Sequence, residues 1–440
     1  MAARTRIWLG GWWLWTAVLV GQGAGHPRAT PESVGMSATR LARMSAALAA
    51  YVDSGRVAGV VAVVTRRGRV AAVDTAGWAD REARVPMRST TIFRIASMSK
   101  AITSVGAMML VEDGKLLLND PIALYLPAFR HMMVLVAPGD SSTGRRDSLV
   151  PATREITVRD LLTHRAGIAY GFLDGATASA YRRAGIHDGI AEGEGTIAAN
   201  VDKIAAQPLA FQPGTKWQYG LSTDVLGRLI EVVSGMPLDR FLEQRIFRPL
   251  QMHDTYFYVP DDKVARIAVP YTRDSTGRLR PMDPLHPFGL GVAGGRGTRG
   301  SRTYVSGGAG VFSTAPDYAR FLQMLLNGGE LDGVRLLSPK TVELMTTSAT
   351  EDLTPSPMGP SAGFGLGFEV VRDVGATGSY GSVGQYFWGG AYGSTFWVDP
   401  KEQLIGVMMI QLVPRPGLTI GERFQTLAYQ AIVVRYVVSP

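Results

Sequence analysis

The hydrophobic positions after residue 37 predict a helix followed by two strands. Apolar side chains first recur every three or four residues, which is the spacing of one face of an α-helix. This face consists of Leu41, Met44, Leu48 and Tyr51. Two β-branched runs follow at residues 60–65 and 70–76, joined by the turn sequence Arg66-Arg67-Gly68. We therefore expect a helix and then an antiparallel hairpin.

The middle of the chain has mainly helical periodicity. One helix is predicted to begin near Ser97 and to end at Asp113-Gly114. Its apolar face consists of Ile102, Val105, Met109 and Leu110. Further helices are expected at residues 158–163, 223–234, 238–247, 316–327 and 339–346. Between them, segments 138–153, 171–195 and 284–302 are rich in Gly, Arg, Asp, Ser and Pro, which favours surface loops or lids.

The tail of the chain returns to strands. The pattern predicts strands at residues 365–371, 392–398 and 404–411, followed by a helix over about 420–434. Strands at both ends with helices between them indicate an α/β (α+β) fold, in which one antiparallel sheet is assembled from both termini and flanked by helices. The predicted domains are a sheet domain of residues 26–95 and 311–440, and an inserted, mainly helical domain of residues 96–310 with Gly-rich lids.

Composition narrows the function classes. With 440 residues, 46% of them hydrophobic, the chain can bury a large core. The formal charge is +8, but the basic residues are scattered among acids, so no nucleic-acid partner is expected. The chain has no cysteine, which excludes disulfides, a thiol nucleophile and thiolate metal sites. Its six histidines show no metal-ligand spacing, and neither a metal nor a cofactor is predicted.

The N-terminus has the layout of a secretory signal. Arg4 and Arg6 precede an apolar run at residues 7–20, and small residues follow through Gly25. We expect residues 1–25 to be a signal peptide and the protein to be periplasmic or secreted, with no membrane span after removal. A retained anchor is the alternative, although the run is shorter than the roughly 20 apolar residues that span a bilayer. The sequence does not determine the oligomeric state.

Ser97 and Lys100 form a candidate nucleophile and base. A separation of three residues places the hydroxyl and the amine on the same face of a helix. A serine hydroxyl becomes a good nucleophile once a neighbouring group takes its proton. Spacing alone leaves a structural alternative open, in which Ser97 caps the helix and Lys100 is solvated.

Three segments give this pair a context. They are Phe-Arg-Ile-Ala-Ser-Met-Ser-Lys at residues 93–100, Leu-Leu-Thr-His-Arg-Ala-Gly at 161–167 and Gly-Ala-Gly-Val-Phe-Ser-Thr-Ala at 308–315. In this order, they resemble the serine β-lactamase and penicillin-binding-protein superfamily, known for its Ser-x-x-Lys motif. The resemblance runs from about Pro31 to the C-terminus. It implies a class C β-lactamase fold and an acyl-enzyme on Ser97.

The resemblance also implies a second base. The family's Tyr-x-Asn corresponds here to Tyr219-Gly220-Leu221, so Tyr219 is the implied partner of Lys100 in moving the Ser97 proton. Leu221 stands where the family has Asn, and the side-chain amide that holds the acylamino group of β-lactams is lost. We expect Leu221 to contact a less polar substrate.

The third family element departs in the same direction. Trp388-Gly389-Gly390 replaces the usual basic residue followed by Thr-Gly or Ser-Gly, a version similar to that of family VIII carboxylesterases. Two glycines allow a close approach of backbone to ligand, so the amides of Ser97 and Ala391 are expected to form an oxyanion hole. Trp388 cannot pair with a substrate carboxylate. The structural alternative makes Trp388 a sheet aromatic and the glycines a bulge.

Together these features predict an exported serine hydrolase that cleaves small-molecule carboxylic esters. A β-lactamase, a D-aminopeptidase or a peptidoglycan-processing peptidase is the alternative within the superfamily. A non-catalytic penicillin-binding-like protein is the alternative from another class.

Several other motifs are discounted. Residues 289–294 match a dinucleotide-binding fingerprint by letters but do not follow a strand. Residues 359–363 spell Gly-x-Ser-x-Gly, yet no strand is expected before Ser361 and no helix after it, so a surface loop is predicted. His164 lies within the second family segment, where its counterpart is structural.

Overall fold

The computed structural model describes residues 27–136, 148–190, 195–282, 299–354, 356–414 and 416–436. The predicted signal peptide at 1–25 and the glycine motif at 289–294 lie outside these ranges. Across the described residues, no helix is both long enough and apolar enough to cross a membrane.

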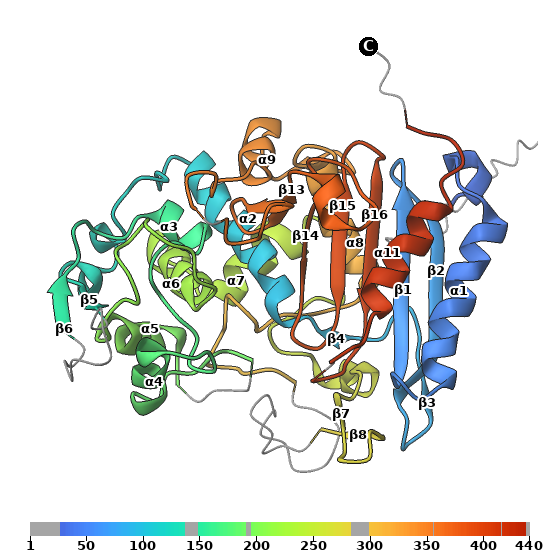
Figure 1. Ribbon diagram of the computed structural model, residues 1–440, viewed down its shortest axis with the longest axis horizontal. Helices are drawn as coiled ribbons and strands as arrows, with labels where there is room; N and C mark the ends of the chain where they lie inside the picture. Colours follow the sequence, from blue (N-terminus) through green and yellow to red (C-terminus); the bar gives the residue numbers. More distant parts are fainter. Residues whose placement is uncertain are drawn as a thin grey trace, which may run out of the picture.

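An eight-stranded antiparallel sheet is built from both ends of the chain (Figure 1). Its strand order is β12-β13-β14-β15-β16-β1-β2-β3, and the two ends of the chain meet where β1 pairs with β16, from Val61 opposite Met409 to Arg66 opposite Leu404. The strands are β1 (Gly59–Arg66), β2 (Arg69–Asp80), β3 (Val85–Pro86), β12 (Ala362–Phe364), β13 (Glu369–Val371), β14 (Tyr386–Gly389), β15 (Thr395–Asp399) and β16 (Leu404–Met409). This arrangement confirms the predicted fold class.

Helices cover both faces of the sheet. Helices α1 (Ala38–Asp53) and α11 (Ile420–Gln430) pack against each other on one face, and α8 (Ala315–Leu326) contacts β1, β15 and β16 on the other (Figure 1). Because successive side chains of a strand point to opposite faces, Val60 joins the α1 and α11 cluster while Val61 joins the main core. Every residue of β1 is buried, as expected for a strand covered on both sides.

The N-terminal helix and hairpin form as predicted. Ser37 caps α1 by accepting a hydrogen bond from the amide of Arg40, and the four predicted apolar positions are the buried ones. The hairpin turn places Arg67 and Gly68 at φ values of 52° and 71°, the left-handed region that tight turns require.

The region between the two halves of the sheet is largely helical. Its main helices are α2 (Ser99–Glu112), α3 (Val158–Leu162), α4 (Ala176–Arg183), α5 (Ile197–Ala205), α6 (Ser222–Ser234), α7 (Leu238–Leu242), and a π-helical turn at Glu243–Phe247. Helices α9 (Pro339–Met345) and α10 (Val374–Thr377) follow α8. Short 3₁₀ turns lie at Pro31–Val34, Ala96–Met98, Ile122–Leu124, Pro127–Phe129 and Asp261–Arg266.

Four small strand pairs complete the described fold. They are β4 (Phe93–Arg94) with β9 (Phe312–Ser313), β5 (Met133–Val136) with β6 (Ser148–Pro151), β7 (Tyr271–Arg273) with β8 (Leu279–Pro281), and β10 (Glu330–Leu331) with β11 (Val334–Arg335). The β4–β9 pair matters most for function because β4 leads directly into the 3₁₀ turn of Ser97. The predicted division into two domains at residues 95 and 310 stays a prediction.

Some boundaries were predicted wrongly. Segment 171–195 contains helix α4, and segment 138–153 contains β6, so neither is wholly a loop. The strand expected at 365–371 begins only at Glu369, because Gly367 takes a φ of 98° and turns the chain after β12. The strand expected at 392–398 begins at Thr395, because Gly393 closes a turn onto the carbonyl of Gly390.

Candidate active site

Ser97 lies in a tight turn between β4 and α2. The residue before it, Ala96, has a φ of 43°, a conformation that L-residues rarely adopt. The turn is fixed from several sides: Tyr318 donates to the carbonyl of Met98 at 2.9 Å, and Ser99 accepts from the amide of Val311 at 3.1 Å. Ser97 is 8% exposed. The fold therefore holds this hydroxyl in one place, at the start of a buried helix.

Lys100 is buried directly beside Ser97. Its Nζ lies 3.3 Å from Ser97 Oγ, 2.8 Å from the hydroxyl of Tyr170 and 2.9 Å from the carbonyl oxygen of Gly308. Three polar partners therefore compensate the burial of this nitrogen. Lys100 is only 2% exposed, so the alternative of a solvated lysine is wrong. Ser97 also does not act as the N-cap, since the residue preceding α2 is Met98.

Tyr219 joins this pair from a distant part of the chain. Its ring centroid lies 4.6 Å from Lys100 Nζ, and its hydroxyl accepts a hydrogen bond from Trp388 Nε1 at 3.4 Å. The structure thus brings Ser97, Lys100, Tyr219 and Trp388 into one site, from β4–α2, the segment before α6, and β14.

The sequence did not indicate Tyr170, which is a direct partner of Lys100. Tyr170 is buried, and burial raises the pKa of its phenol well above the usual value, so the hydroxyl stays protonated. Its position three residues after the Leu-Leu-Thr-His-Arg-Ala-Gly segment was the available signal. The hydroxyl that meets Lys100 most directly is thus that of Tyr170, whereas Tyr219 meets it through its ring.

Aromatic side chains border the site of Ser97 and Lys100, and we call them the aromatic wall: Tyr170, Phe172, Tyr219, Phe364 and Trp388. Phe172 is 41% exposed and stacks on Tyr170 with ring centroids 4.6 Å apart. Trp388 lies 5.4 Å from Tyr219 and 5.4 Å from Phe364, measured between ring centroids. A site bordered by aromatic rings favours substrates with apolar groups.

His164 belongs to the packing of this wall. Its ring lies 5.0 Å from that of Tyr219 and is almost completely buried. Burial, and then the charge of Lys100, lower the pKa of His164 to about 3, so the ring is neutral near pH 7. A neutral ring inside an aromatic cluster fits the structural role predicted for it.

The end of β14 lies against the turn of Ser97. A Cβ on Gly390 would stand 2.5 Å from the carbonyl oxygen of Ile95, so only glycine allows this approach. The next residue, Ala391, packs on the same small cluster as Ala96. This places the backbone after Trp388-Gly389-Gly390 beside the nucleophile.

Leu221 occupies a different position from the one expected. It is the N-cap of α6, and its side chain is completely buried in the main hydrophobic core. A side chain with no exposed surface packs the start of α6, which leaves no surface of Leu221 for the predicted substrate contact.

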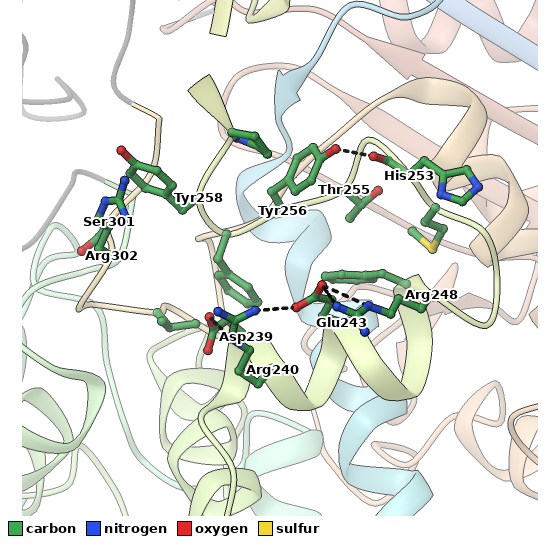
Figure 2. A pocket seen from close by; sticks show the side chains of 15 residues that line it. Asp239, Arg240, Glu243, Arg248, His253, Thr255, Tyr256, Tyr258, Ser301 and Arg302 are labelled. Atoms are coloured by element: carbon green, nitrogen blue, oxygen red, sulfur yellow. Dashed lines mark hydrogen bonds and ion pairs between the residues drawn. The ribbon is translucent and has the colours of Figure 1, made fainter. Parts of the chain in front are cut away.

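A separate hollow of about 510 Å³ lies between the π-helical turn and the segment at residues 252–260 (Figure 2). Arg240 and Arg248 at its rim both pair with Glu243, and Arg302 stacks on Tyr258. None of the Ser97 site residues lines it. Within the described ranges, no group of three or more His, Asp or Glu side chains could hold a metal ion.

Ser361 lies in a turn, and its carbonyl accepts hydrogen bonds from the amides of Arg372 and Asp373. A strand, β12, follows it directly, which is the reverse of the strand-then-helix order of a nucleophile elbow.

Comparisons with known proteins identify relatives over most of the chain. Residues 44–430 match the profile of the family described as Beta-lactamase. The chain is 33% identical to Esterase EstB of Burkholderia gladioli, covering 84% of this chain and 90% of that protein. It is 32% identical to the Lovastatin esterase of Penicillium rubens, with coverages of 88% and 97%. The solved structure of EstCE1, described as a hydrolase with promiscuous acyltransferase activity, has a TM-score of 0.75 and 29% identity, covering 89% of this chain and 99% of that one.

Proposed function

The chain belongs to the beta-lactamase family of serine hydrolases, and from that premise we propose that it cleaves carboxylic esters through an acyl-enzyme on Ser97. The observation that carries the proposal is the buried contact of 3.3 Å between Lys100 Nζ and Ser97 Oγ. A lysine held out of water against a serine hydroxyl is arranged to exchange a proton with it.

The proposed reaction has two halves. Lys100 and Tyr219 take the proton of Ser97 while its oxygen attacks the ester carbonyl, and the amides of Ser97 and Ala391 hold the oxyanion. The C–O bond to the alcohol then breaks, and the alcohol leaves with a proton returned from the same groups. Water attacks the acyl-enzyme in the second half, which releases the acid and restores the hydroxyl of Ser97.

Neutral esters are the proposed substrate class. Trp388 stands where a cation would pair with the carboxylate of a β-lactam or a peptidoglycan stem. Aromatic rings border the site, including the exposed ring of Phe172. EstB and the Lovastatin esterase, both named as esterases, support ester hydrolysis.

The proposal is tested by replacing one serine and then another. Ser97→Ala should abolish hydrolysis of a short p-nitrophenyl ester while circular dichroism shows an intact fold. Ser361→Ala is the matched control and should retain activity, since Ser361 lies in a turn before β12. Turnover by a well-folded Ser97→Ala protein would refute the assignment.

A substrate panel separates the related activities. Neutral esters should be turned over faster than a chromogenic cephalosporin or a D-amino-acid amide, and a strong preference for the cephalosporin would reverse the assignment. If neither turnover nor labelling of Ser97 by a fluorophosphonate occurs, the protein is a non-catalytic member of the family.

Export is also part of the proposal. It rests on residues 1–25, where Arg4 and Arg6 precede the apolar run. Expression of the full chain should give a periplasmic or secreted protein that begins near residue 26, whereas a cytoplasmic protein with an intact N-terminus would contradict it.

A further inference from the structure

A fully buried carboxyl group lies behind the catalytic lysine. Asp224 is on α6 and has no exposed surface. Its Oδ1 accepts a hydrogen bond from Ser306 Oγ at 2.6 Å and from the Tyr304 hydroxyl at 3.4 Å. Tyr304 in turn accepts from Asn200 Nδ2 at 2.8 Å. Burying a carboxylate costs free energy unless hydrogen bonds or a countercharge compensate it, so Asp224 is expected to serve a specific role here.

Gly308 connects Asp224 to Lys100. The carbonyl of Gly308 accepts a hydrogen bond from Lys100, and Asp224 lies against the Cα of the same residue. A Cβ built on Gly308 would stand 2.6 Å from Asp224 Oδ2, 3.4 Å from Lys100 Nζ and 3.4 Å from the Tyr170 hydroxyl. The carboxylate, the amine and the phenol therefore meet around one glycine.

Asp224 also fixes the turn that carries this glycine. Ser306 Oγ donates to Asp224 and accepts from the amide of Ala309 at 3.0 Å, so one hydroxyl ties the carboxylate to both sides of Gly308. The carbonyl of Ser306 accepts from the amide of Gly310 and closes the turn. Loss of the carboxylate removes the group to which the turn is fastened.

We propose that Asp224 is a positioning residue for Lys100: it holds the Ser306–Gly310 turn against the lysine and supplies the negative charge that balances the buried amine. This inference rests on the proposed function and deepens it, because it adds a residue that acts on the nucleophile through Lys100. Asp224 does not touch Ser97 in the described structure, and no bond to the substrate is assigned to it.

Activity then depends on the charge of the Asp224 carboxyl group. Burial raises the pKa of Asp224 to about 6, while the Ser306 hydrogen bond and the charge of Lys100 act in the opposite direction. The other titratable groups that face it are Tyr170 and Tyr304, whose pKa values burial raises, and Asp188, whose charge also raises the pKa of Asp224. As the pH falls through about 6, Asp224 becomes neutral, its hydrogen bond from Ser306 weakens and the negative charge beside Lys100 is lost.

The test compares two buried aspartates. Asp224→Asn keeps the shape but removes the charge, and we expect kcat for a p-nitrophenyl ester to fall about 10- to 100-fold with little change in KM, the scale of a misplaced catalytic group. The acid limb of the pH profile near pH 6 should disappear. Asp317→Asn is the matched control: burial raises the pKa of Asp317 to about 6 as well, but its partners are Thr255 and the amide of Asp254. This variant should retain kcat and the acid limb.

A second variant should shift the acid limb of the pH profile in a direction that structural damage would not produce. The Ser306 hydrogen bond lowers the pKa of Asp224, so Ser306→Ala should move the acid limb to higher pH. An unchanged limb in Ser306→Ala, or an Asp224→Asn protein with wild-type kcat and pH profile, would overturn the inference.

Labelling keeps the two proposals distinguishable. The rate at which a fluorophosphonate modifies Ser97 reports its nucleophilicity without any ester, and it should show the same acid limb in the wild type and lose it in Asp224→Asn. Absence of ester turnover with pH-dependent labelling would reject the proposed substrate class but support the role of Asp224. Ester turnover with identical pH profiles in both proteins would reject only the role of Asp224.

Discussion

Gly308→Ala adds one methyl group at the point where Asp224, Lys100 and Tyr170 meet. The new Cβ would lie 2.6 Å from Asp224 Oδ2, a distance that real Cβ atoms essentially never show, and 3.4 Å from Lys100 Nζ. The backbone of Gly308 is not in the left-handed region, so the cost comes from the contact and not from backbone strain. Overpacking of this kind destabilises a protein by about 1–3 kcal/mol.

The effect on activity should exceed the effect on stability. Asp224 or the Gly308 carbonyl must move by several tenths of an ångström to accept the methyl group, and Lys100 loses its fixed acceptor. Misplacement of a catalytic group by about 1 Å costs on the order of 100-fold in rate. Urea denaturation measures the stability of the variant, and steady-state hydrolysis of a p-nitrophenyl ester measures kcat and KM.

Gly421→Ala is the matched control on α11. A Cβ there would lie 3.5 Å from Thr395 Cγ2, an ordinary van der Waals contact, so the substitution should stabilise the protein by about 0.4–1 kcal/mol and leave activity unchanged. If Gly308→Ala instead keeps wild-type kcat and wild-type stability, the convergence of Asp224, Lys100 and Tyr170 on Gly308 is not what the enzyme requires.

Three further predictions concern Tyr170, Trp388 and Glu369. Tyr170→Phe removes the hydroxyl 2.8 Å from Lys100 Nζ but keeps the ring, so kcat/KM should fall about 10-fold or more without loss of thermal stability; unchanged turnover would exclude a role for this hydroxyl. Trp388→Ala removes the donor to Tyr219, so both kcat and the affinity for aryl esters should fall, as initial rates would show; a variant with wild-type kcat and KM would contradict this. Burial raises the pKa of Glu369 from 4.5 to about 7, so ionisation of this carboxyl group destabilises the folded protein. The stability is complete below pH 4.5 and is lost as the pH rises through 7. Glu369→Gln should therefore be about 1–3 kcal/mol more stable than the wild type at pH 8 and equal to it at pH 4, and equal stability at both pH values in urea denaturation would contradict the shift.

Local signals in the sequence were sufficient for much of the fold. The helix after Ser37 and the hairpin around Gly68 were predicted because helical spacing, a capping residue and turn residues all indicate the same structure. The Gly-rich segment that contains α4 misled the prediction, because its apolar residues, such as Ala178 and Tyr181, are buried only by tertiary packing.

The candidate site was predictable only in part for a similar reason. Ser97 and Lys100 are three residues apart at the start of a helix, so the sequence predicts them on one face, and the three family segments favoured a catalytic pair over a helix cap. Tyr170 and Asp224 are far from Lys100 in the sequence and come near it only through the tertiary fold around Gly308, which no short-range pattern marks. Leu221 was expected beside the substrate from its place in the motif. A motif does not show whether a side chain points into the core, and that of Leu221 is completely buried.

Mass spectrometry of the acylated protein tests the central claim most directly. The protein is mixed with a fluorophosphonate, or quenched during turnover of a slowly hydrolysed ester, and its mass and peptides are compared with those of Ser97→Ala. One added group on the peptide that contains Ser97, absent from the Ser97→Ala protein, is the result that we predict. A group found on Ser361 or another residue, or one that persists in Ser97→Ala, would contradict the account.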